Sequence, residues 1–99
     1  MARSKKSQSE HNSTVKKLAK QYRQKGYEVK ADVEGWKKPG TIKSVRPDII
    51  AEKSGHKTVV EVETKESVHN KRDLQQQKAF RDWSKNSNRK HYKRIVTEK

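Results

Sequence analysis

Hydrophobic residues recur at helical spacing in two segments of the chain, one near each end. The first segment starts at Ser9 and ends at Gly26, and its apolar stripe at i, i+3, i+4 and i+7 consists of Val15, Leu18, Ala19 and Tyr22. The second segment, residues 71–84, carries the same spacing in Gln76, Ala79, Phe80 and Trp83. These patterns predict two amphipathic helices, and Leu74 falls on the opposite side of the second one.

Four other segments have the pattern of β-strands. They are residues 27–33, 45–51, 57–64 and 91–97. The second and third are rich in Ile and Val, which indicates burial on both faces, and the polar turn Ser54-Gly55-His56 joins them. The predicted order is α-β-β-β-α-β, and the right-handed crossover places the last strand parallel to the third. We therefore expect an α/β domain with a mixed sheet flanked by helices.

The remaining segments give the boundaries of this domain. Residues 1–8 are polar and basic and are predicted to form a disordered tail, so the domain spans residues 9–99. Residues 34–44 contain two glycines and a proline and read as a loop, and residues 66–70 read as a polar linker. A chain of 99 residues is expected to form a single domain.

Composition narrows the partners of such a domain. The formal net charge is +14, from 26 Lys+Arg against 12 Asp+Glu, which predicts a polyanionic partner, most commonly DNA or RNA. Only 27% of the residues are hydrophobic, so the core is small. The absence of cysteine excludes disulfides and thiolate metal sites, and the four histidines are scattered. No apolar stretch is long enough to cross a membrane, so we expect a cytoplasmic protein.

Three acidic residues occupy unusual positions in the predicted sheet. Asp48 follows Pro47 at the start of an apolar strand, and Glu61 lies 13 positions later inside the most apolar strand. In a hairpin of this length the two carboxylates can lie side by side, and Glu63 projects to the same face as Glu61. Such a group repels itself unless a cation lies between its members, and oxygen ligands suit Mg²⁺ or Mn²⁺. The alternatives are that Asp48 caps a turn and that Glu63 pairs with a lysine.

The segments Pro47-Asp48 and Glu61-Val62-Glu63 resemble the signature of the PD-(D/E)xK nuclease superfamily, which has the restriction-endonuclease-like fold. The match has one departure, because Glu63 stands where the superfamily most often has lysine. Lys65 has the same strand parity and could supply the positive charge, as could Lys30 or Lys43 from elsewhere in the domain.

The resemblance implies roles for individual residues. Asp48 and Glu61 would bind the metal, and Glu63 would act as a ligand or would orient the attacking water. Gln76, four residues before Phe80, resembles the Gln-x-x-x-Tyr/Phe element of the recombination-nuclease branch and would complete the catalytic set.

A further metal ligand is implied on the first helix. Glu10 matches the position of a metal-binding glutamate in many superfamily members, including the small archaeal Holliday-junction resolvases. A glutamate near a helix N-terminus is also favoured by the helix dipole, and Glu34 is a competing acid.

Basic and aromatic residues near the acidic group are candidates for contacts with nucleic acid. They are Lys37, Lys38, Lys43, Arg46, Lys65 and Arg72, together with Trp36. Trp36 could stack on a base, or it could cover an edge of the core.

The sequence therefore favours a Mg²⁺- or Mn²⁺-dependent endonuclease that acts on DNA, including structured or junction DNA, and the resemblance is compatible with a homodimer. One alternative is a non-catalytic nucleic-acid-binding module on the same fold. Another is a protein–protein adaptor with a basic surface.

Overall fold

The computed structural model of the chain describes residues 5–63, 71–85 and 87–96. The elements are helix α1 (Lys5–Gln24), strands β1 (Glu28–Ala31), β2 (Ile49–Lys53) and β3 (His56–Glu63), helix α2 (Lys71–Ser84) and strand β4 (Lys90–Val96). This order confirms the predicted α-β-β-β-α-β arrangement. Over the described residues, neither helix is long and apolar enough to span a lipid bilayer.

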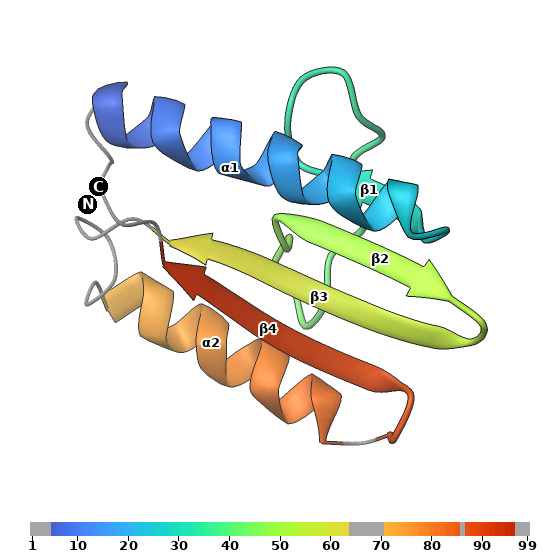
Figure 1. Ribbon diagram of the computed structural model, residues 1–99. Helices are drawn as coiled ribbons and strands as arrows, with labels where there is room; N and C mark the ends of the chain where they lie inside the picture. Colours follow the sequence, from blue (N-terminus) through green and yellow to red (C-terminus); the bar gives the residue numbers. More distant parts are fainter. Residues whose placement is uncertain (1–4, 64–70, 86, 97–99) are drawn as a thin grey trace.

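The four strands form one mixed sheet in the order β1-β2-β3-β4. The pairs β1–β2 and β2–β3 are antiparallel, and β3–β4 is parallel, as the crossover rule predicts. The two helices flank the sheet, with α1 lying across β1 to β3 and α2 beside β4 (Figure 1). The α/β fold class is therefore confirmed.

Each face of the sheet has its own hydrophobic cluster. On the α1 face, the helix residues Val15 and Ala19 pack with Val60 and Val62 of β3. Side chains alternate along a strand, so Val59 points to the other face, where it packs with Phe80 and other residues of the second cluster. The central strand β3 is consequently buried on both sides, as its run of valines indicates.

Several element boundaries differ from the predicted ones. Helix α1 begins at Lys5 rather than Ser9, so the predicted tail overlaps its first turn, while residues 1–4 lie outside the described residues. Strand β2 begins at Ile49 rather than Val45. The reason is Pro47, which has no N–H to donate to a strand ladder and limits the residue before it.

Val45 pairs instead with Ile42 across a tight turn, through two backbone hydrogen bonds of 2.7 and 2.9 Å. The two residues between them, Lys43 and Ser44, both have positive φ angles, of 50° and 68°. Ile42 and Val45 pack against the cluster on the α2 face, so this turn anchors the long β1–β2 connection to the sheet.

The β2–β3 hairpin fixes the register on which the candidate site depends. Lys53 pairs with His56, and the two residues between them form a turn in which Ser54 has φ 52° and Gly55 has φ 81°. Positive φ at both positions is the signature of a type I′ hairpin turn, whose twist matches that of the strands.

Replacing Gly55 with alanine should lower the free energy of unfolding by about 1–2 kcal/mol, because a side chain at a left-handed position collides with its own backbone. The added Cβ would meet only the flexible end of Arg89, at 3.4 Å, so backbone strain dominates. Gly40→Ala is the matched control, since its Cβ would meet no atom within 4 Å. Urea denaturation measures both variants, and equal stabilities would contradict the assignment of a strained turn.

Candidate active site

The ladder between β2 and β3 ends in two carboxylates instead of a backbone pair. Ile49 pairs with Val60 at the last position of the ladder. At the next position, Asp48 and Glu61, the hydrogen bonds are made between backbone N–H groups and carboxylate side chains. The backbone N–H of Asp48 donates to Oε2 of Glu61 at 2.7 Å. The backbone N–H of Val62 donates to Oδ2 of Asp48 at 2.9 Å. The structure thus brings the two predicted acids together at the end of the hairpin.

Glu61 lies in an environment that disfavours a negative charge. Its exposed fraction is 4%, and the pKa of this carboxyl is raised from 4.5 to about 10, with burial as the largest cause. The negative charge of Asp48, a hydrogen bond between the two side chains and the charge of Glu63 contribute to the rise, whereas the N–H of Asp48 lowers the pKa. Without a cation, Glu61 is therefore protonated at neutral pH.

Glu63 belongs to the same acidic group. It is also 4% exposed, has the strand parity of Glu61 and contributes to the raised pKa of Glu61. Glu61 and Glu63 are thus buried at the carboxyl end of β3, and the half-buried Asp48 comes from the segment before β2.

His11 of α1 completes this group, and the sequence reasoning missed it. The ring is buried, with Nε2 3.1 Å from Oδ2 of Asp48 and Nδ1 3.2 Å from Oδ1 of Asn12. Both ring nitrogens therefore lie close to oxygen atoms of neighbouring side chains. The sequence did contain a signal, because His11 precedes the core residues Val15 and Ala19 at helical spacing and so faces the sheet.

Glu10, the implied ligand on this helix, is half-buried. Successive residues of an α-helix lie about 100° apart around its axis, so Glu10 and His11 point in different directions. The contact with Asp48 is made by His11, and a metal-binding role for Glu10 stays a prediction.

Gln76 is half-buried on α2, one helical turn before the fully buried Phe80. Helix α2 covers the face to which Val59 points, and strand alternation assigns Glu61 and Glu63 to that face. Helix α2 begins beside the carboxyl ends of β3 and β4 (Figure 1), and a catalytic role for Gln76 stays a prediction.

The candidate nucleic-acid contacts lie mostly on the β1–β2 connection. The residues exposed there are Lys37, Lys38, Lys43 and Arg46. Trp36 is half-buried, packs against the cluster on the α1 face and has the Arg23 guanidinium 5.4 Å from its ring centroid, which supports the alternative that it covers a core edge. Lys65 and the side chain of Arg72 lie outside the described residues.

The fold and the acid pair define a restriction-endonuclease-like domain. A comparison with protein families matches residues 2–84 to the AHJR-like family, described as REase_AHJR-like. Because this match covers more than half of the chain, the chain belongs to that family and thus to the PD-(D/E)xK restriction-endonuclease-like superfamily. Neither the curated proteins nor the solved structures gave a match.

Domains of this kind typically use divalent metal ions. Within the described part of the chain, no three His, Cys, Asp or Glu side chains are grouped so that they could hold a metal ion together. Two adjacent carboxylates nevertheless fit Mg²⁺, which is commonly held by one or two carboxylates while water and substrate phosphate fill its other positions. The raised pKa of Glu61 fits as well, because a cation would relieve the repulsion that raises it.

The buried proton on Glu61 should make stability depend on pH. Its pKa is higher in the folded protein than in the unfolded chain, so the folded state holds one more proton between about pH 4.5 and pH 10. Stability should therefore fall as pH rises through this window, and each kcal/mol lost lowers Tm by about 4–8 °C. Thermal melts in a chelating buffer measure this slope.

Glu61→Gln should reduce the dependence of Tm on pH and raise Tm at pH 8, because the amide keeps the shape of the side chain and cannot ionise. Glu52→Gln is the control, since Glu52 is an exposed carboxylate on β2. If both variants keep the wild-type slope, the buried proton is assigned to the wrong group.

Proposed function

We propose that this protein is a divalent-metal-dependent endonuclease that cleaves DNA. The observation that carries the proposal is the pairing of the buried Glu61 with the half-buried Asp48 at the open end of the β2–β3 ladder. Burying two acids side by side is costly unless a cation or a proton compensates them. The net charge of +14 supports a polyanionic substrate, and membership of a restriction-endonuclease-like family supports nuclease activity.

Asp48 and Glu61 would hold the metal, Mg²⁺ or Mn²⁺, and Glu10 remains a candidate for an additional ligand. When bound, the metal supplies Lewis-acid stabilisation of the scissile phosphate and lowers the pKa of a coordinated water. The Val62 N–H donates to Oδ2 of Asp48 and the His11 ring lies 3.1 Å from the same oxygen, so the carboxylate is positioned before substrate arrives.

The other residues of the site have separate proposed roles. Glu63 would orient the attacking water, the role that the absent lysine leaves open, and Gln76 would approach the site from α2. The His11 ring lies beside Asp48 from α1, on the opposite side of the sheet from α2. The resemblance to the small junction resolvases extends the proposed substrates to structured or junction DNA. It also makes a homodimer the proposed oligomeric state.

A non-catalytic nucleic-acid-binding module is the second candidate. Glu63 in the position of the usual lysine favours it, as does the high pKa of Glu61, which makes the metal compete with a proton. Calorimetric titration with Mn²⁺ separates the two functions, because only a nuclease site should give binding heat that Asp48→Asn removes.

Asp48→Asn should reduce cleavage of labelled DNA by at least about a hundredfold, because it removes charge from a metal ligand. The fold should survive, since an amide oxygen can still accept the Val62 N–H. The assay uses duplex, junction and single-stranded DNA with Mg²⁺ or Mn²⁺. Glu52→Gln, which changes an exposed carboxylate on the neighbouring strand, should cleave like wild type.

Wild-type protein that binds Mn²⁺ and DNA but cleaves none of these substrates would contradict the enzymatic assignment. Equal cleavage by wild type and Asp48→Asn would place the chemistry elsewhere.

DNA affinity should fall steeply with salt, because each phosphate contact by lysine or arginine releases condensed counterions. With about six such contacts, the affinity should drop about a thousandfold between 50 and 200 mM salt. Fluorescence anisotropy with a labelled duplex in chelating buffer measures this without cleavage. A flat salt response would show that the positive charge serves another purpose.

A further inference from the structure

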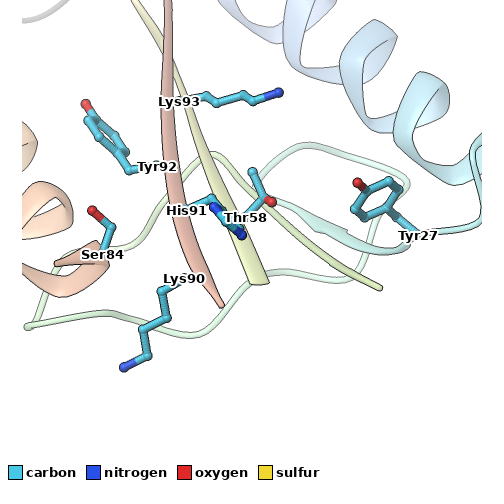
Figure 2. A pocket seen from close by; sticks show the side chains of 7 residues that line it. All are labelled: Tyr27, Thr58, Ser84, Lys90, His91, Tyr92 and Lys93. Atoms are coloured by element: carbon cyan, nitrogen blue, oxygen red, sulfur yellow. The ribbon is translucent and has the colours of Figure 1, made fainter. Parts of the chain in front are cut away.

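A polar pocket of about 520 Å³ lies beside β4, away from the acidic group. Its lining residues are Tyr27, Thr58, Ser84, Lys90, His91, Tyr92 and Lys93 (Figure 2). Helix α1 lies across β1 to β3 and α2 lies beside β4, so β4 is open on the α1 face near the exposed residues His91 and Lys93 (Figure 1).

The strand register assigns three of these side chains to the α1 face. Thr58 pairs with His91, and Val60, which packs under α1, pairs with Lys93. Residues at the same level of neighbouring strands point to the same face, so Thr58, His91 and Lys93 share the face of Val60. Figure 2 shows Lys93 extending toward α1, and Thr58 between His91 and Tyr27.

Contacts behind the pocket hold its walls in place. The Tyr27 ring meets Tyr22 edge-on, with centroids 5.1 Å apart, and the Lys53 ammonium lies 5.4 Å from the Tyr27 centroid. Nε2 of His91 is 3.1 Å from Nδ1 of His56. Thr58, only 6% exposed, forms a rigid floor. These contacts fix Tyr27, His91 and Thr58 before any ligand arrives, which lowers the cost of binding.

The chemistry of the lining is that of an anion site. The described residues that line the pocket offer ammonium groups, an imidazole and hydroxyls, and no carboxylate is among them. Lys90 adds a cation from the other side of β4, where its ammonium lies 5.3 Å from the Trp83 centroid. Since hydroxyl and ammonium donors together suit phosphate oxygens, the preferred ligand is a phosphate group.

We propose that this pocket binds a backbone phosphate of the DNA substrate, with Lys93, His91, Thr58 and Tyr27 as its contacts. The proposal rests on the proposed function. Thr58 precedes Glu61 by three residues of β3, about 10 Å along the strand, and strand alternation places the two side chains on opposite faces of the sheet. The phosphate bound in the pocket would therefore be a different one from the phosphate at the acids.

The test measures the binding of two ligands, inorganic phosphate and duplex DNA, to the full-length protein. Inorganic phosphate, added at constant ionic strength, should shift the backbone amide NMR signals of Thr58, His91 and Lys93. Lys93→Gln should raise the Kd for duplex DNA about threefold to tenfold. It should also reduce the slope of log affinity against log salt concentration by about one. Lys20→Gln, at an exposed position on α1, removes the same charge and should have a smaller effect.

Thr58→Val separates a built site from general surface charge. The variant keeps the net charge and the side-chain shape but loses the hydroxyl, so it should weaken phosphate binding while Tm stays near the wild-type value. Unchanged phosphate binding in Thr58→Val, or equal DNA affinities for Lys93→Gln and Lys20→Gln, would overturn the phosphate site and leave the nuclease proposal standing. If wild-type protein binds phosphate in this pocket but no DNA, the nuclease proposal fails and the anion site remains.

Discussion

The rest of the structure depends on the electrostatic cost of burying Glu61 beside Asp48. Two carboxylates at the end of a central strand repel each other, and burial removes the water that would otherwise screen them. The fold meets this cost partly with backbone N–H groups, which donate from Asp48 and Val62 to the two side chains. A proton on Glu61 meets the remainder, and a divalent cation could replace that proton.

This arrangement explains why the acids lie at a strand end. Strand β3 is covered on both faces along its length, with Val60 under α1 and Val59 under α2. At its carboxyl end the pairing with β2 stops, because Pro47 precedes Asp48 and cannot extend the ladder. Backbone N–H groups that would have paired with a neighbouring strand become donors to side chains. The end of the ladder thus holds the two carboxylates in fixed positions, and His11 of α1 lies beside Asp48.

The distribution of charge follows the same logic. The acids are buried at one end of the sheet, while lysines and arginines occupy the exposed loop after β1 and the edge strand β4. A nucleic acid bound over these residues would be attracted by the periphery and would be held close to the acids only with a cation between them. A surface with this much positive charge also destabilises the folded chain, whose core is small. A bound polyanion would neutralise the charge and remove that destabilisation.

The sequence by itself determined the order of elements, the mixed sheet and the pairing of Asp48 with Glu61, because apolar periodicity and hairpin length are local properties of the chain. It did not determine which residue of α1 meets the acids. Glu10 and His11 are neighbours in sequence, and only the rotation of the packed helix decided that His11 contacts Asp48. The late start of β2, the pocket beside β4 and the half-buried position of Trp36 also arise from tertiary packing, since each depends on which surfaces the two helices cover.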